Sequence, residues 1–247
     1  MDRLIYTAMT GAAQALQQQA TVSENLANAA TPGFRAALHT FRAVPVLGEG
    51  LPTRSFVVDS TAGADFTQGP LQQTGRALDV AVQGEGWIAV QGADGKQAYT
   101  RSGSFQITSN GVLQTRSGLN VAGDSGPITL PPDTAVSFAK DGTISAVPSG
   151  ANPAAVTVVG RLKLVNPPES QLERGDDGLF RLKNGSEAST DENVSVLSGS
   201  VEGSNVNIVE AMVNMISLAR KFDMQMKMLQ TADNNSRQAS QIMDIRG

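Results

Sequence analysis

The clearest guide to the fold is residues 205–229, which read NVNIVEAMVNMISLARKFDMQMKML. Asn205 or Asn207 can act as an N-cap, and no proline or glycine follows before Gly247. We therefore expect a helix of about 35 residues within residues 201–247, a length typical of coiled coils. Steps of four and three residues select one heptad row of apolar positions, which consists of Ile208, Met212, Met215, Ala219, Phe222, Met226 and Leu229.

Residues 1–34 carry a shorter pattern of the same kind. Pro32 disfavours the α conformation at Thr31, and Gly33 accepts a positive φ at low cost, so the helix should stop there. Gly11 and a cluster of glutamines weaken this helix when it is isolated. The same four-and-three spacing gives the row Ile5, Met9, Ala12, Leu16, Gln19, Ser23 and Leu26.

Residues 70–200 have a different character. Leu78, Val80 and Val82 alternate with other residues at a period of two, which is typical of strands. Five turn dipeptides separate such runs and predict antiparallel hairpins: Asp94-Gly95, Asn110-Gly111, Asp141-Gly142, Asp177-Gly178 and Asn184-Gly185.

The predicted fold class is therefore α+β. N- and C-terminal coiled-coil-type helices, in residues 1–34 and 201–247, flank a central all-β domain of antiparallel hairpins at 70–200. Residues 35–69 are rich in proline and glycine and are expected to form an extended arm that leads from the first helix to the β-domain.

Composition excludes several classes of function. The 247-residue chain has a net charge of −4 and no cysteine, and its only histidine is His39. Disulfides, thiolate metal sites, cysteine nucleophiles and multi-histidine metal sites are thereby excluded, and we expect no cofactor. The basic residues form no cluster for nucleic acid, no apolar run is long enough for membrane insertion, and the N-terminus lacks the pattern of a cleaved signal peptide.

Two short motifs have catalytic look-alikes. Residues 123–126, GDSG, are similar to the nucleophile loop of serine proteases, but the only available base is His39, in the expected arm. Residues 84–89, GEGWIA, fit a dinucleotide fingerprint, yet the residues after the glycines predict a strand where the fingerprint needs a helix. Turns between strands explain both motifs, and we expect no enzyme; a hydrolase that uses Ser125 is the catalytic alternative.

Blocks along nearly the whole chain resemble the flagellar basal-body rod and hook proteins. Any single block is weak evidence, but the blocks occur in the family's order. The opening residues 1–6, MDRLIY, the chain length and residues 220–227 resemble proximal-rod members more than distal-rod or hook members. The blocks are SENLAN at 23–28, TPGFR at 31–35, GPL at 69–71, LDVAVQG at 78–84, YTRSGSF at 99–105, SNVN at 204–207 and TAD at 231–233.

This resemblance implies a structural subunit of the proximal rod, which transmits torque from motor to hook. It also implies export through the flagellar type III apparatus without a cleaved signal peptide, and a place in the basal body within the periplasmic space. The implied partners are proximal and distal rod subunits and further copies of the chain. The expected assembly interface comprises Ile5, Met9, Leu16, Leu26, Asn28, Pro32, Gly33, Phe34, Asn205, Asn207, Met212, Met215, Ala219, Phe222, Met226 and Leu229.

Two other structural interpretations remain open. One is a distal-rod protein of the same family. The other is a secreted β-domain binding module whose two helices form a dimerisation stalk. A discrete dimer in solution would favour the stalk, whereas a monomer that enters filaments only with partners would favour the rod.

Overall fold

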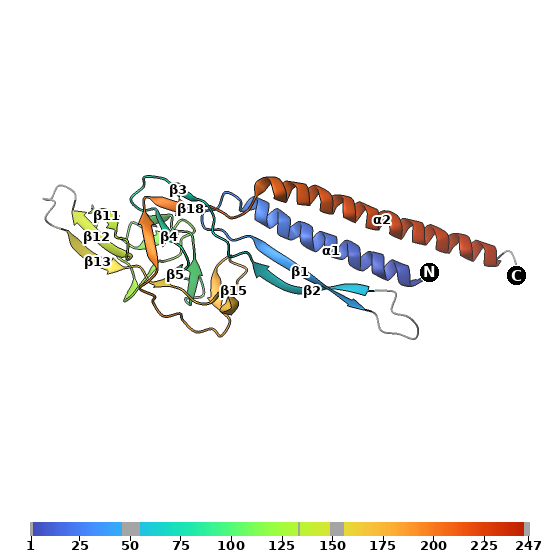
Figure 1. Cartoon of the computed structure of the whole chain (residues 1–247), viewed down its shortest axis with the longest axis horizontal. Coiled ribbons are helices and arrows are strands. Elements are labelled where there is room, and N and C mark those ends of the chain that lie inside the picture. The colour runs from blue at the N-terminus through green and yellow to red at the C-terminus, as the bar shows by residue number, and fades with distance from the viewer. Residues whose placement is uncertain (1, 46–54, 133, 149–155, 245–247) are drawn as a thin grey trace. The chain divides into compact units, whose positions relative to one another are not determined.

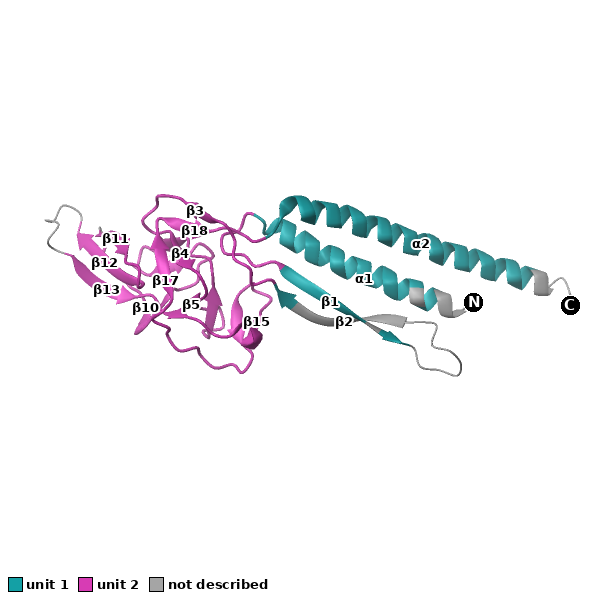
Figure 2. Cartoon of the chain, viewed as in Figure 1, with its two compact units in different colours: residues 1–29, 37–64, 206–247 teal, residues 30–36, 65–205 magenta. Residues whose placement is uncertain are grey.

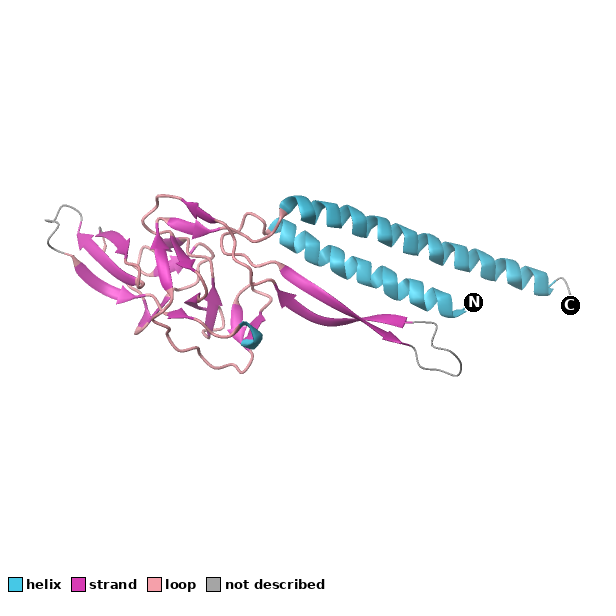
Figure 3. Cartoon of the chain, in the orientation of Figure 1, coloured by secondary structure: helices cyan, strands magenta, loops and turns pink. Residues whose placement is uncertain are grey.

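The computed structural model describes residues 2–45, 55–132, 134–148 and 156–244. The chain forms two compact units (Figure 2), the first of residues 1–29, 37–64 and 206–247, the second of residues 30–36 and 65–205. Two long terminal helices pack together, and the chain between them forms antiparallel sheets (Figure 3). The predicted α+β class is confirmed.

The first unit contains the helix pair (Figure 1). Helix α1 runs over Asp2–Ala27 and helix α2 over Ile208–Asp244. The helices are antiparallel, because Gly11 lies against the Gln225 side chain whereas Asn25 and Asn214 line one cavity. Since α2 has 37 residues and α1 has 26, the C-terminal part of α2 extends past the start of α1.

Part of the expected arm is a hairpin that belongs to the helical unit. Strands β1, Ala37–Pro45, and β2, Ser55–Ala64, pair antiparallel, while residues 46–54 of the arm lie outside the described residues. The Asn25 side chain joins α1 to β1, because its Oδ1 accepts the Ala37 N–H at 2.7 Å and its Nδ2 donates to the Ala37 carbonyl at 3.0 Å. One amide thus satisfies both backbone groups of Ala37.

The second unit is built from small sheets, and every strand pair recorded among the described residues is antiparallel. The sheet with most strands has the order β14-β5-β6-β16-β15. Its strands are β14 Leu164–Val165, β5 Trp87–Gln91, β6 Gln97–Thr100, β16 Phe180–Leu182 and β15 Leu172–Arg174, with a 3-10 turn at Glu169–Gln171 before β15.

The other sheets have two or three strands each. A sheet of order β11-β12-β13 comprises Thr134–Phe138, Thr143–Pro148 and Thr157–Arg161. The two-stranded pairs are β17 Ser195–Ser198 with β4 Val80–Gln83, β18 Ser200–Glu202 with β3 Leu71–Gln73, β7 Phe105–Ile107 with β8 Leu113–Thr115, and β10 Gly126–Pro127 with β9 Ala122–Gly123.

The turn dipeptides fall where hairpins need them. Gly95, Gly111, Gly142 and Gly178 have positive φ and lie between paired strands, whereas Gly185 also has positive φ but follows β16 without closing a hairpin. These turns bring together a core made mainly of branched aliphatic side chains. Its fully buried members include Val80, Ile88, Leu113, Ile144 and Leu162.

Strand β4 departs from the simple alternation expected for it. Ala81 is buried as completely as Val80 and Val82, so both faces of the strand are covered. Asp79, just before the strand, is also buried, and its carboxylate accepts hydrogen bonds from Ser104 Oγ at 2.9 Å and Thr74 Oγ1 at 2.7 Å. A polar residue at the buried edge is tolerated because its oxygens have partners.

Candidate assembly surfaces

The two helices bury small side chains against each other. On α1 the buried apolar residues are Ala8, Ala12 and Ala15. On α2 they are Ala211, Leu218 and Ala232, with Met215, Phe222 and Leu229 half-buried on the same side. With the half-buried Gln225 included, the spacing of these α2 positions alternates between four and three residues, so the helix pair does use a heptad register.

Several large apolar side chains of both helices are exposed instead. Tyr6, Met9 and Leu16 of α1 are each more than 50% exposed. In a soluble helix the usual arrangement is the reverse, with large side chains inside and small or polar ones outside. On α2 the exposed apolar residues are Ile208, Val209, Met212, Val213, Ile216, Met224, Met226 and Met228. We call these eleven residues the outer apolar faces.

The predicted α2 row is therefore divided between two sides of the helix. Met215, Phe222 and Leu229 lie on the half-buried side. Ile208, Met212, Ala219 and Met226 are exposed, because the register buried within this chain passes through Ala211, Leu218 and Ala232 instead. The predicted α1 row is divided in the same way: Ala12 is buried, Ile5 and Leu26 are half-buried, and Met9 and Leu16 are exposed.

Helix α1 ends slightly earlier than the proline and glycine alone indicate. Its last residue is Ala27, and Asn28 satisfies the carbonyl of Glu24 with both its backbone N–H, at 3.1 Å, and its side-chain Nδ2, at 2.9 Å. Gly33 has φ +70°, as expected. A Cβ there would also lie 2.3 Å from the backbone of Arg101 and Ser102, so glycine is required for close approach as well.

The two candidate caps of α2 have different roles. Asn207 is the N-cap, since its Oδ1 accepts the backbone N–H groups of Val209 at 3.1 Å and Glu210 at 3.2 Å. Asn205 instead connects other segments: its Oδ1 accepts the Ala36 N–H at 2.7 Å, and its Nδ2 donates to carbonyls of the 65–67 segment, at 2.9 Å to residue 65 and 3.0 Å to residue 67.

Three segments of the second unit meet at Asn205, at the places where the chain passes to and from the first unit. We call residues 33–36, 65–69 and 202–205 the junction. Besides the bonds of Asn205, the Gly33 N–H donates to the Glu202 carbonyl at 2.8 Å, and the Gly69 N–H donates to Glu202 Oε1 at 3.0 Å. The junction therefore links residues that are far apart in sequence.

A buried cluster of charges lies within the junction. Glu202 Oε1 is 2.7 Å from Arg35 Nη1, and its Oε2 is 3.0 Å from Arg101 Nη1. All three side chains are at most 4% exposed, and both guanidinium groups lie over the Trp87 ring. Burial lowers the pKa of Arg101, and the neighbouring Glu202 carboxylate opposes that shift.

Sequence reasoning missed this cluster. Arg35 and Arg101 both lie inside the blocks that resemble the family, and this was the signal that could have singled them out. An arginine is ordinarily exposed, however, and nothing in the sequence pairs either one with Glu202. The predicted residues Pro32 and Phe34 are half-buried beside it. The pair becomes visible only in the three-dimensional structure, because Arg35 and Glu202 are far apart in the sequence.

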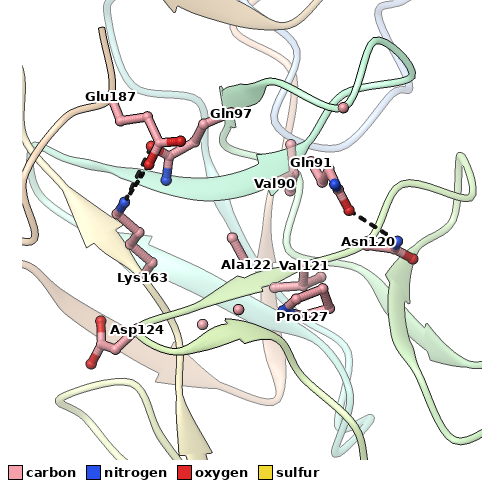
Figure 4. Close-up of a pocket in the computed structure, with 13 residues that line it drawn as sticks. Val90, Gln91, Gln97, Asn120, Val121, Ala122, Asp124, Pro127, Lys163 and Glu187 are labelled. Atoms are coloured by element: carbon pink, nitrogen blue, oxygen red, sulfur yellow. Dashed lines mark hydrogen bonds and ion pairs between the residues drawn. The ribbon is translucent and has the colours of Figure 1, made fainter.

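The catalytic look-alikes have no catalytic surroundings. A cavity of about 240 Å³ adjoins the 123–126 turn (Figure 4), but no histidine lines it. Lys163 there is paired with Glu187 at 3.2 Å, and Asn120 Nδ2 donates to Gln91 Oε1 at 3.3 Å. The 84–89 motif forms a turn that leads into β5 rather than into a helix.

Comparisons with known proteins identify the family. Family models match residues 5–35 as a flagella basal body rod protein, residues 81–146 as the flagellar hook protein FlgE/F/G D1 domain, and residues 197–242 as the flagellar basal body rod FlgEFG protein C-terminal region. The chain is 50% identical to the flagellar basal-body rod protein FlgF of Escherichia coli, over 99% of this chain and 100% of that protein. The chain belongs to the FlgF family of flagellar basal-body rod proteins.

Other relatives agree with this membership. FlgF of Salmonella typhimurium is 49% identical over the same shares of both chains. FlgG of Buchnera aphidicola (subspecies Acyrthosiphon pisum) is 33% identical, over 90% of this chain and 92% of that protein. The FlgF family is structural, so the rod protein described here is not an enzyme. Among the described residues, no helix is both long and apolar enough to cross a membrane.

Proposed function

We propose that this rod protein is a subunit of the proximal rod that polymerises through the outer apolar faces of α1 and α2 and transmits torque from motor to hook. The observation that carries the proposal is the arrangement of the helix pair, whose buried apolar residues are mostly alanines while methionine, isoleucine, valine, leucine and tyrosine side chains are exposed. Large apolar side chains exposed in such number on a pair of helices are typical of a protein interaction site.

The exposed side chains are large enough for their burial to contribute substantial free energy to assembly. Burying one such side chain contributes roughly 1.5–3 kcal/mol, so several of them on each subunit can offset the entropy lost on assembly. Five of the exposed residues are methionines, whose flexible side chains can pack against neighbours of different shape. This suits a subunit that contacts both identical and non-identical rod proteins.

The partners we propose are copies of this chain and the proximal and distal rod proteins that adjoin it. Full-length similarity to FlgF at 50% identity, against 33% to a FlgG, supports a proximal place. Membership of the family also supports export through the flagellar type III apparatus and a location in the basal body within the periplasmic space.

A charge on the outer face tests the proposal. Ile216→Asp, at a position 56% exposed, should leave folding of the subunit almost unchanged. In an assembled rod the same carboxylate would be desolvated without a partner, which costs several kcal/mol. We expect loss of motility and of complete rods in electron micrographs of basal bodies, while the thermal transition of the purified subunit stays the same.

Lys221→Asp is the matched control. Lys221 is exposed on the same helix but lies off the outer apolar faces, and its substitution changes the charge by more than Ile216→Asp does. It should be milder. Complete rods in Ile216→Asp cells would contradict assembly through this face, and a discrete dimer of the purified protein that Ile216→Asp dissolves would support the dimerisation stalk instead.

A further inference from the structure

The α1 side of its contact with α2 is built from small side chains. Coiled coils choose a register when large side chains fit into matching holes. Among the described side chains of α1, the buried ones are small, namely Ala8, Ala12, Ala15 and Thr21, so Leu218 of α2 meets a shallow surface on α1. At Gly11 a Cβ would meet only the mobile amide end of Gln225, at 3.1 Å.

Short segments of chain connect the junction to both helices. Residues 28–32 separate the end of α1 from Gly33, and residues 206–207 separate Asn205 from the start of α2. Sliding one helix by a heptad moves it about 10 Å. With the junction intact, the 28–32 segment could follow only by breaking its own turn bonds, such as Phe34 N–H to the Thr31 carbonyl at 3.3 Å.

Arg35 connects the N-terminal side of this reference to the C-terminal side. Its Nη1 is 2.7 Å from Glu202 Oε1, and both side chains are at most 1% exposed. None of the three guanidinium nitrogens of Arg35 has a hydrogen-bond acceptor among the described residues, so the contact with Glu202 is an ion pair. Glu202 is therefore the polar partner that holds this guanidinium in place, and the pair is poorly explained by its own stability, since a buried ion pair often contributes less than an apolar replacement.

We propose that Arg35 and Glu202 are positioning residues: their buried ion pair sets the antiparallel register of α1 against α2. Buried polar pairs are best attested in this role, as devices that select one register among several of similar packing. The inference concerns the fold of one subunit, so it stands or falls separately from the assembly proposed above.

The absence of cysteine from the chain permits a direct test. The double variant G11C/Q225C reports the observed register, and G11C/A232C reports a slip of one heptad. Each full-length protein is purified and treated with a short bismaleimide, and the intramolecular product is quantified by mass spectrometry of its peptides. We expect the first pair to crosslink and the second to remain almost unlinked.

Each pair is then placed in Arg35→Met and Arg101→Met backgrounds. Both substitutions remove one arginine from the same carboxylate, and both should lower the thermal transition of the β-domain. Only Arg35 belongs to the segment that leads to α1. We expect Arg35→Met to lose most of the 11–225 product and to gain the 11–232 product, whereas Arg101→Met keeps the observed register.

Asn205→Ala provides a second route if Arg35→Met fails to fold. It removes the acceptor of the Ala36 N–H and the donor to the 65–67 carbonyls without uncovering a charge, and it too should release the register. The proposal is overturned if neither junction variant shifts the crosslink, if Arg101→Met shifts it equally, or if the unaltered background already yields both products.

Discussion

The two units of this rod protein differ in which apolar side chains they bury. The second unit hides Ile88, Leu113 and Ile144 completely, together with a buried ion cluster. Among its described side chains, the helical unit buries mainly alanines, together with Leu218, and leaves five methionines and several branched aliphatic side chains exposed. The comparison shows that a chain can place a self-sufficient core and an unfinished one side by side in sequence, and that the unfinished one is where neighbours are expected to bind.

Of the changes that test this comparison, Glu202→Ala should have the largest effect, which is on the stability of the second unit. The substitution leaves two buried guanidinium groups without their counter-ion, which costs about 3–5 kcal/mol. The fluorescence of Trp87, which both guanidinium groups face and which is the only tryptophan, reports unfolding of the second unit. We expect a large drop in its denaturation midpoint. A midpoint within error of the parent would show that the cluster does not hold this unit together.

A matched pair of leucines sharpens the comparison next. Leu113→Ala, in the core of the second unit, should lower the free energy of unfolding by about 2–5 kcal/mol. Leu16→Ala makes the same chemical change at a side chain that is 51% exposed, and should stay within about 0.5 kcal/mol. Urea titrations of both variants give the two values; equal losses would contradict the contrast between the units.

A fragment of residues 65–205 tests whether the second unit is self-sufficient, and we expect it to fold alone. Glu202 would keep Arg101 and lose Arg35, so the transition should fall modestly while the core amides stay protected in hydrogen exchange. A fragment of residues 30–205 restores Arg35 and should recover the difference. Unprotected core amides in both fragments would contradict the independence of this unit.

The smallest expected effect is a loss of stability of the second unit at acidic pH. A hydrogen bond from Arg181 lowers the pKa of Asp177 below its ordinary value of 3.8. A carboxylate with a depressed folded pKa stabilises the fold above that ordinary value, and this contribution is lost as the pH falls through the folded pKa. Asp177→Asn should therefore make stability less dependent on pH below about 4.

Asp94→Asn is the control for that measurement. Asp94 lies 3.8 Å from the same guanidinium, against 2.6 Å for Asp177. Thermal transitions followed at several acidic pH values compare the two variants, and an equal flattening in both would point to general charge rather than to the Asp177–Arg181 pair. Asp177 is 40% exposed, so solvent screens the effect and it should be small.

Local sequence signals predicted the elements better than their partners. The helix extents, the glycine turns and the N-cap role of Asn207 depend on neighbouring residues, and the sequence shows them directly. The hairpin at 37–64 was missed because prolines and glycines at 45–52 mask the pairing of its flanking strands. Arg35 pairs with Glu202, which is almost 170 residues away in the sequence, and no local pattern encodes that contact.

The heptad row illustrates the same limit within a single helix. Its period was predicted correctly, but a row of apolar residues in a helix does not say which half faces the chain's own partner. Ala211 and Leu218, which the buried register uses, lie beside the predicted row, and the small size of Ala8, Ala12 and Ala15 decides the choice. When a helix has apolar residues on more than one side, the side that is buried depends on the residues of the element that packs against it.

The methionines of the outer apolar faces have a chemical consequence. Met9, Met212, Met224, Met226 and Met228 are all solvent-exposed in the single subunit. Oxidation converts the thioether of methionine to a sulfoxide, a polar group that disrupts apolar contacts. If subunits assemble through these faces as proposed, a subunit oxidised before assembly would present a polar surface to its neighbours, whereas burial in a finished rod would shield the same sulfur atoms. Oxidant exposure should therefore impair construction of the rod far more than it damages rods already built.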